Sequence, residues 1–154
     1  MRTCASLALA LGCARVSGPP NLILISLDTT RRDHTSVYGY ERETTPNLEK
    51  LAADGVRFAL AYAPSATTGP SHATLFTSLH PITHRVVKNG RVLTPPHETL
   101  AERLREHGWV TAGVVSSYVL DARFGYAQGF DVWDDDFEPA TATVLDEQWE
   151  GVGV

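Results

Sequence analysis

The first strong hydrophobic pattern of the chain is a nearly continuous apolar run. Residues 21–27 read Asn-Leu-Ile-Leu-Ile-Ser-Leu, and Asp28 follows them directly. A short run with so little polar alternation is typical of a strand that is buried on both faces of a parallel sheet. We therefore predict a first central strand over 21–27, with Asp28 at its carboxyl end.

Helical patterns alternate with further apolar runs along the chain. A helix is predicted over 45–55, because proline suits its first turn and glycine its end. A second is predicted over 71–79, with Ser71 as the N-cap and His-Pro as the stop. A third is predicted over 99–108, which opens with a Thr-x-x-Glu capping box and closes at glycine.

Two more strands are predicted between and after these helices, over 56–63 and 109–115. Alternating strands and helices indicate an α/β fold with a mostly parallel central sheet and helices on both faces. Ligands of such sheets bind beyond the carboxyl ends of the strands, where Asp28 and the loop around Thr68 are expected to meet. The acidic run 134–136 is interpreted as solvated surface, and no core element is predicted after position 139.

Residues 1–20 differ in composition from the rest and predict a signal peptide or lipoprotein signal. Arg2 precedes a short apolar run, and Cys13 ends a sequence that resembles a lipobox, although Ala10 stands where leucine is usual. The run is too short to span a bilayer. The alternative is an ordinary chain start. We expect an exported protein, periplasmic or associated with the cell envelope, with membrane attachment through a lipidated Cys13, and a catalytic part over 21–154.

Composition narrows the classes of partner. The chain has 154 residues, 43% of them hydrophobic, which is enough for a globular core rather than a disordered chain. Its formal net charge of -5 and the lack of a basic stripe argue against nucleic-acid binding and leave a small anionic ester as the favoured partner. The two cysteines, Cys4 and Cys13, both lie in the amino-terminal segment, so no disulfide framework is predicted for the rest.

Two places carry candidate chemistry. Asp28 offers a hard oxygen ligand at a strand end, although a turn-forming or helix-capping role is the more common one for an aspartate after a strand. The stretch from Thr67 to His72 places hydroxyls and a glycine before a helix, whose amino terminus can stabilise an anion beside an activated hydroxyl. Thr68 would attack and His72 would help to hold the anion. The alternative is a capped turn with solvated threonines.

Several sequence blocks, taken in order and spacing, resemble the sulfatase family. They are residues 24–34, 38–40, 45–48, 51–58 and 70–77, and the similarity continues through 99–108, 113–116 and 124–131. The resemblance implies an alkaline-phosphatase-like α/β fold in which a metal ion and a side-chain nucleophile cleave sulfate or phosphate esters.

The resemblance also implies roles for individual residues. Asp28 matches the first metal-binding aspartate, while Thr29 stands where many sulfatases have another. Thr68 matches the Cys or Ser that becomes formylglycine, a conversion that threonine cannot undergo, and His72 replaces the arginine of that motif. A related branch of the superfamily uses an unmodified threonine. Thr68 is therefore expected to be the nucleophile and, with Asp28, a ligand of a divalent metal ion, Ca²⁺ first and Zn²⁺ or Mn²⁺ as alternatives.

Substrate contacts are expected further along the chain. His84, Lys88 and Asn89 lie where the family places basic and amide groups that face the substrate, although a solvated surface lysine is the ordinary alternative for Lys88. Asp33 and His34 are candidate outer partners of Asp28, with a purely structural role equally open. Family members take further metal ligands from segments beyond position 154, so we expect a truncated domain with an exposed apolar edge.

These observations predict a sulfatase-like, metal-dependent hydrolase of sulfate esters with Thr68 at the nucleophile position. Two alternatives remain open. The first is a phosphodiesterase or phospho-group transferase of the same superfamily, which an unmodified threonine favours. The second is a non-catalytic truncated domain.

Overall fold

A computed structural model describes residues 20–137 of the chain. The predicted signal segment up to position 19, with the predicted lipidation site Cys13, and the stretch after 139 lie outside the described residues. Within 20–137, no helix combines the length and the apolar character that crossing a membrane requires.

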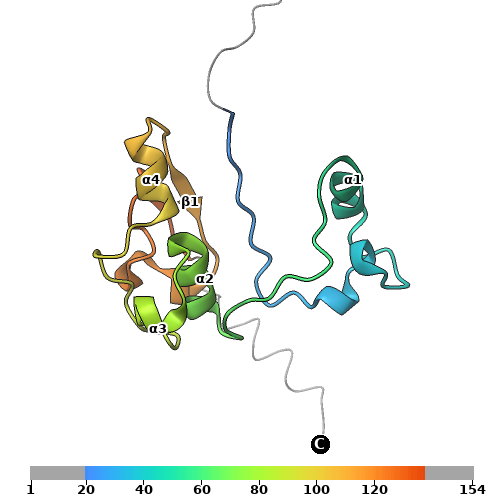
Figure 1. The fold of residues 1–154 in the computed structure, drawn as a ribbon, viewed down its shortest axis with the longest axis horizontal. Coiled ribbons are helices and arrows are strands. Elements are labelled where there is room, and N and C mark those ends of the chain that lie inside the picture. The colour runs from blue at the N-terminus through green and yellow to red at the C-terminus, as the bar shows by residue number, and fades with distance from the viewer. Residues whose placement is uncertain (1–19, 138–154) are drawn as a thin grey trace, which may run out of the picture.

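The described residues form short helices, two short strands and long connections (Figure 1). The α-helices are α1 (Pro46–Asp54), α2 (Thr68–Thr77), α3 (Pro81–His84) and α4 (Leu100–Glu106); the strands are β1 (Ala112–Val114) and β2 (Val132–Asp134); and single 3₁₀ turns occur at η1 (Arg32–His34), η2 (Ser36–Tyr38), η3 (Tyr118–Leu120) and η4 (Ala122–Phe124).

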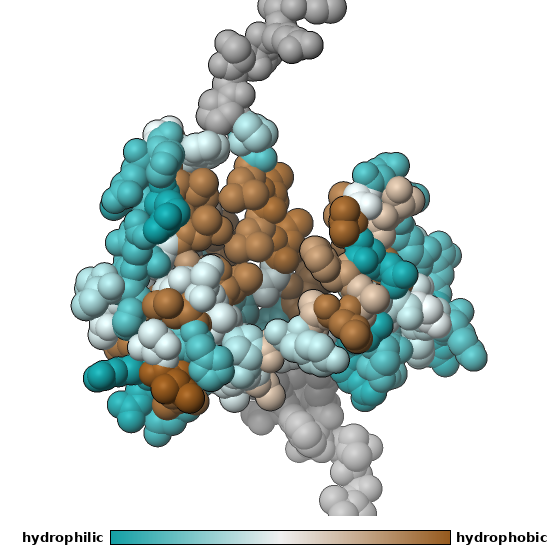
Figure 2. Space-filling model, in the orientation of Figure 1, coloured by the Kyte–Doolittle hydropathy of each residue, from teal (hydrophilic) through white to brown (hydrophobic). Residues whose placement is uncertain are grey.

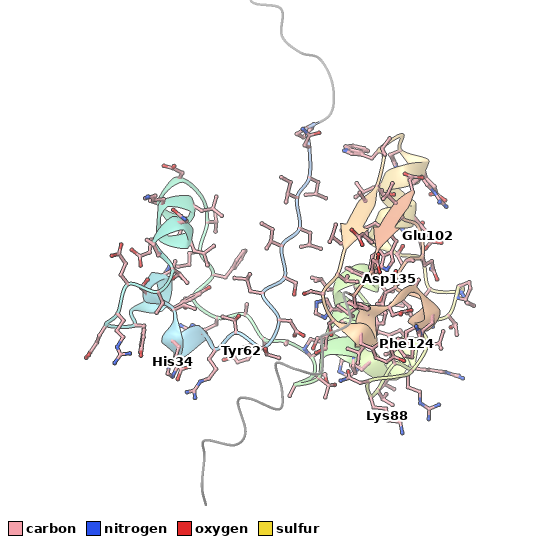
Figure 3. All side chains as sticks on the ribbon, turned by 180° about the vertical axis from the view of Figure 1, so that it is seen from behind. His34, Tyr62, Lys88, Glu102, Phe124 and Asp135 are labelled. Carbon is pink, nitrogen blue, oxygen red and sulfur yellow. The ribbon has the colours of Figure 1, made fainter. Side chains whose placement is uncertain are left out.

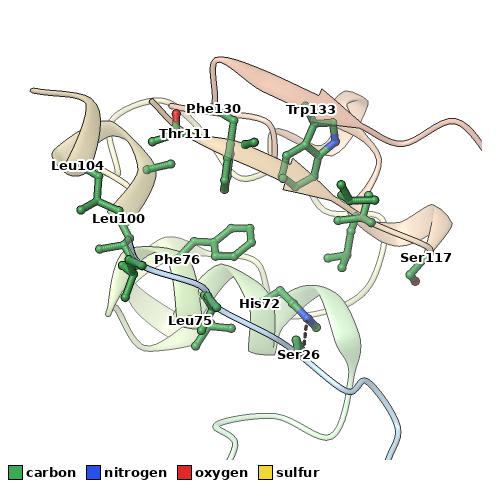
Figure 4. A pocket seen from close by; sticks show the side chains of 18 of the residues that line it. Ser26, His72, Leu75, Phe76, Leu100, Leu104, Thr111, Ser117, Phe130 and Trp133 are labelled. Atoms are coloured by element: carbon green, nitrogen blue, oxygen red, sulfur yellow. Dashed lines mark hydrogen bonds between the residues drawn. The ribbon is translucent and has the colours of Figure 1, made fainter. Parts of the chain in front are cut away.

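The strands β1 and β2 pair in parallel, with Ala112 opposite Val132. Figure 4 shows α2 and α4 together on one side of this pair. The predicted α/β class with parallel strand pairing is thus confirmed. A second group of elements, η1, η2 and α1, packs separately, and residues 20–28 run between the two groups in both opposite views (Figures 1 and 3).

The helix predictions hold, with shifted boundaries. The 45–55 helix is observed as α1, and the 99–108 helix as α4 with its capping box formed: Thr99 Oγ1 accepts from the Glu102 amide and Glu102 Oε2 accepts from the Thr99 amide. The 71–79 helix begins earlier, at Thr68, because the Ser71 hydroxyl donates to the Ser65 carbonyl at 2.6 Å and does not cap. The short helix α3 was not predicted.

The strand prediction for 21–27 is wrong for the described structure. These residues run extended without strand pairing, and we call 21–28 the extended segment. Ile23 is 80% exposed and Ile25 74%, and Figure 2 shows hydrophobic side chains gathered along this segment. The apolar run has the composition of a doubly buried strand, but the described residues cover it on one side only. The exposed apolar edge that we expected is therefore observed.

Two other strand assignments also need correction. Residues 56–63 form no strand, and Val56 and Tyr62 are strongly exposed. Conversely, β2 covers the start of the acidic run that the sequence suggested was solvated surface. The aspartates make this strand hard to predict from sequence, because Asp has a low strand propensity. Trp133 holds the strand against the core by packing on Phe130, at a ring-centroid distance of 4.9 Å.

The hydrophobic core lies around the start of α2 and the turns beside it. Its buried members come from segments that are far apart in the sequence, and they are Ala73, Val86, Leu93, Leu120 and Tyr126. Because Ala73 belongs to α2, this core fixes the helix whose first residue is Thr68.

Glu102 links the α4 cap to the turn before β2, and this link predicts a pH-dependent stability. Burial by itself would raise the pKa of Glu102, but hydrogen bonds from Gln128 and Thr99 outweigh it and hold the pKa below the ordinary value of 4.5. A lowered pKa means that this stabilisation is present above the ordinary value and is lost as the pH falls through the folded-state value.

Glu102→Gln is expected to lower the free energy of unfolding by about 1 kcal/mol at neutral pH. The deficit should shrink well below pH 4.5, because the wild-type carboxylate is then also neutralised. Urea unfolding followed by circular dichroism at both pH values measures this. Glu98→Gln is the control, since Glu98 makes only an exposed ion pair with Arg103. An equal deficit at both pH values would contradict the role of the charge.

Candidate active site

Asp28 and Thr68 lie side by side where the extended segment meets α2. The Thr68 hydroxyl donates a hydrogen bond of 2.8 Å to Asp28 Oδ2, across 40 residues of sequence. The other oxygen of the carboxylate, Oδ1, accepts from the Thr29 amide at 3.0 Å. Thr29 adopts a left-handed backbone with φ 55°, which turns the chain sharply after Asp28. The convergence expected from the sequence is therefore present in the structure.

The first turn of α2 is held from two sides. Asn89 Oδ1 accepts a hydrogen bond of 2.8 Å from the Gly69 amide, and the buried Tyr126 hydroxyl donates one of 2.7 Å to the Gly69 carbonyl. Burial raises the pKa of Tyr126 well above its ordinary value, so the phenol remains a donor. These bonds fix the backbone next to Thr68.

Gly69 allows this close approach because it lacks a side chain. A Cβ at this position would lie 3.0 Å from the Tyr126 hydroxyl and 3.1 Å from Asn89 Oδ1. Sequence reasoning placed Asn89 near the substrate but did not identify Tyr126. The segment 124–131 that contains it was noted only as part of a wider resemblance.

His72 is buried and both of its ring nitrogens have partners. Nδ1 lies 2.8 Å from the Thr68 carbonyl, and Nε2 lies 2.9 Å from the Ser26 hydroxyl (Figure 4). The side chain therefore sits one turn behind Thr68 and contacts the extended segment. Ser26 was not predicted as a site residue, although its position two residues before Asp28 in an extended chain puts the two side chains on the same side.

The expected substrate residues do not all gather around Thr68. His84 is 1% exposed, accepts from the Val86 amide at 3.1 Å and contacts Thr74 Oγ1 at 3.0 Å. Burial lowers the pKa of His84, and electrostatic repulsion from the nearby His97 and His80 lowers it further. Its geometry is that of a core residue.

Lys88 and Asn89 differ in their surroundings. Lys88 is exposed at the rim of the group that contains α2 (Figure 3), whereas the Asn89 side chain is engaged with the Gly69 amide. The Arg31 guanidinium donates a hydrogen bond to the Asp33 carboxylate, and this bond together with the charge of Arg31 lowers the pKa of Asp33. The His34 ring lies near the Tyr40 ring, with the two centroids 4.9 Å apart. Within residues 20–137, no hydrogen bond links Asp33 or His34 to Asp28.

The backbone amides at the start of α2 are largely occupied by groups of the protein. Gly69 donates to Asn89, Pro70 has no amide hydrogen, and Ser71 donates to the Thr67 carbonyl at 3.3 Å. An anion near Thr68 would therefore be stabilised by the positive end of the helix dipole more than by a set of free amides.

The described residues do not make up a complete divalent metal site. Within 20–137 no group of three or more His, Cys, Asp or Glu side chains is placed to hold a metal ion. The oxygens of Asp28 and Thr68, hydrogen-bonded to each other, fall short of the six to eight oxygens that Ca²⁺ takes.

An open groove of about 290 Å³ runs from this site along the extended segment. Its polar end contains Ser26, Asp28 and His72, and its remaining walls are mainly apolar side chains of α2, α4 and the β1 region (Figure 4). The groove therefore reaches the Asp28 carboxylate to which the Thr68 hydroxyl donates.

The chain is similar in sequence to known sulfatases. The chain is 40% identical over 123 residues to arylsulfatase A of Bos taurus, and this match covers 75% of this chain and 24% of that protein. It is 30% identical over 142 residues to N-acetylgalactosamine-6-sulfatase of Canis lupus familiaris, covering 82% and 27%. The chain thus spans about a quarter of the length of these relatives.

A solved structure has a similar fold. The phosphonate monoester hydrolase of Agrobacterium radiobacter matches with a TM-score of 0.67 and 29% sequence identity, over 84% of this chain and 29% of that one. This neighbour confirms the alkaline-phosphatase-like class. The sulfatase family model matches residues 20–149, and the chain therefore belongs to the sulfatase family.

Proposed function

We propose that this chain carries the nucleophile end of a sulfatase-like hydrolase of sulfate esters, in which Thr68 attacks and Asp28 accepts its proton. The observation that supports the proposal most directly is the 2.8 Å hydrogen bond from the Thr68 hydroxyl to the Asp28 carboxylate. A nucleophile within hydrogen-bond reach of a base is the arrangement that activates a weak hydroxyl.

The proposed reaction has two stages. As the Thr68 proton moves to Asp28 Oδ2, the Thr68 oxygen forms a bond to the ester's sulfur, the bond from sulfur to the organic oxygen breaks, and the alkoxide leaves with a proton from solvent. Water then attacks the sulfo group, and the bond from sulfur to the Thr68 oxygen breaks. That oxygen takes back the proton from Asp28, and the released hydrogen sulfate loses its proton to solvent. The positive end of α2, whose first residue is Thr68, would stabilise the negative charge that develops on the transferred group.

Other residues have supporting roles in the proposal. Asn89 holds the Gly69 backbone in place and so fixes the direction of the Thr68 side chain, and the exposed Lys88 beside it would attract the anion as a point charge. Asp28 is the residue that the family resemblance assigns to a divalent metal ion, Ca²⁺ first, although the described residues alone do not complete such a site. Export, with a lipidated Cys13, is also proposed from residues 1–20.

The proposal is tested with the 154-residue chain and a panel of aryl esters. Turnover of an aryl sulfate is measured with and without added Ca²⁺, and the protein is then quenched and digested. We expect the peptide that contains Thr68 to carry the added mass of a sulfo group. Turnover without any such adduct, together with an adduct elsewhere, would overturn the assignment of the nucleophile.

A phosphoryl or phosphonyl ester is the second candidate substrate. It is favoured by the unmodified Thr68, which cannot become formylglycine, and by the similarity to a phosphonate monoester hydrolase. Phosphate and phosphonate monoesters and a phosphodiester in the same panel discriminate, since a higher kcat/KM for any of them reverses the order of the two candidates. No turnover of any ester, with or without metal, would favour the third reading, a non-catalytic truncated domain.

A further inference from the structure

The extended segment is joined to α2 by two side-chain hydrogen bonds that form a matched pair. Asp28 pairs with Thr68 at 2.8 Å and Ser26 pairs with His72 at 2.9 Å. Residues two apart in an extended chain point to the same side and are spaced by about 6.6 Å. Residues four apart on a helix are likewise neighbours on one face, about 6 Å apart. Both bonds can therefore form together without distortion.

The His72 ring is oriented to receive the Ser26 hydroxyl. A carbonyl oxygen can only accept, so Nδ1 donates its hydrogen to the Thr68 carbonyl at 2.8 Å. In the neutral ring Nε2 is then an acceptor, and the Ser26 hydroxyl donates to it at 2.9 Å. The ring is 7% exposed and meets Phe76 edge to face, which limits its rotation.

The rest of the extended segment is held on one side only, where Leu22 and Leu24 face the groove. The side chains of Ile23 and Ile25 point into solvent, and the segment forms no strand pairing within the described part of the chain. At its far end, the Trp109 indole donates to the Pro20 carbonyl at 3.3 Å. The position of Asp28 relative to Thr68 thus depends strongly on the neighbouring bond at Ser26.

We propose that Ser26 and His72 form a positioning latch, which holds the carboxylate of Asp28 against the hydroxyl of Thr68. The latch deepens the proposed hydrolase function and its catalytic consequence rests on that function. Both residues act through Asp28 and are positioning residues. The role differs from the anion-holding role expected for His72 from sequence, because both ring nitrogens already have partners within the protein.

Three variants separate the contacts of the latch. Ser26→Ala removes the donor. His72→Gln keeps an acceptor oxygen near the place of Nε2, whereas His72→Asn keeps a donor near the place of Nδ1 but cannot reach Ser26. Ser117→Ala is the matched control, because it also removes a serine hydroxyl from the groove lining, but on the opposite wall from Ser26 (Figure 4).

The first readout needs no enzymatic activity. In NMR spectra of the full 154-residue chain, nuclear Overhauser contacts between the side chains of Asp28 and Thr68 should weaken or vanish in Ser26→Ala and His72→Asn. They should persist in His72→Gln and Ser117→Ala. Contacts between Tyr126 and Gly69 should persist in all four, which shows that the core remains folded. Unchanged Asp28–Thr68 contacts in Ser26→Ala, or equal loss in both His72 variants, would overturn the latch.

The second readout is ester turnover. Ser26→Ala and His72→Asn should lower kcat by about 10- to 100-fold with KM nearly constant, because a misplaced base slows the chemical step more than binding. His72→Gln should recover most of that loss. If the contacts change as expected but no variant, including the wild type, hydrolyses any ester, the latch stands and the proposed function fails. If turnover is present and Ser26→Ala leaves kcat unchanged, the latch has no catalytic role and the proposal is overturned.

Discussion

Thr68→Ala is expected to lower kcat by about 10³-fold or more on whichever ester the chain hydrolyses, because it removes the attacking oxygen. The variant should fold normally. The bonds that fix the start of α2 use the backbone of Gly69, with Asn89 and Tyr126 as partners, and they do not involve the Thr68 side chain. Steady-state turnover measures the effect, and thermal unfolding by circular dichroism checks the fold.

Two controls sharpen this expectation. Thr67→Ala removes the adjacent hydroxyl, which contacts Ser65 at 2.9 Å and faces no base, so turnover should stay near the wild-type value. Thr68→Ser keeps the oxygen and loses only a methyl group, so it should retain activity within about tenfold. If Thr68→Ala turns over as fast as Thr67→Ala, another group carries the reaction and the pairing with Asp28 is structural.

The meeting of Asp28 and Thr68 could be predicted from sequence because it follows from chain topology. Asp28 at the end of an apolar run and the loop around Thr68 before the next predicted helix are both expected beyond the carboxyl ends of the strands in a parallel α/β sheet. That expectation holds even though residues 21–27 form no paired strand, because the extended segment still ends with Asp28 against the first residue of α2.

The partners of this pair could not be predicted, because they depend on packing between distant segments. Ser26 meets His72 across 46 residues and Tyr126 meets Gly69 across 57. Neither pair forms a motif, and a serine in a strand or a tyrosine in a turn has many ordinary uses. His84 shows the reverse case: a histidine in a family-like position is a buried core residue, which only its contacts with Thr74 and Val86 reveal.

The strand predicted over 109–115 is observed as β1, whereas the assignments over 21–27 and 56–63 failed for a related reason. Hydrophobic periodicity reports what a segment would bury and not whether a partner is present. The extended segment has the composition of a central strand, but the described residues supply contacts on one side of it. The reverse error occurs at β2, where the acidic residues predict exposed surface but a strand is present. Pairing with β1 and the packing of Trp133 stabilise this strand.

Gly125→Ala is expected to destabilise the α2-containing group by about 3 kcal/mol or more, the largest stability effect that the structure predicts. Gly125 has φ +82°, a left-handed conformation that costs a side chain about 1 to 2 kcal/mol. A Cβ would also lie 2.1 Å from the carbonyl oxygen of Leu93. Leu93 is 1% exposed and its amide donates to the Phe124 carbonyl at 2.9 Å, so its backbone cannot yield without breaking the core.

Gly90→Ala separates the two causes, because Gly90 has a similar φ of +78° but no atom within 4 Å of the added methyl group. Its expected cost is about 1 kcal/mol, the conformational part alone. Urea unfolding of both variants measures the difference. Tyr126 follows Gly125, and its hydroxyl donates a hydrogen bond to the Gly69 carbonyl. A shifted turn at Gly125 would therefore release the backbone that orients Thr68. A Gly125→Ala variant no less stable than Gly90→Ala would mean that the Leu93 backbone moves freely, and the core could then not be what fixes the direction of the nucleophile.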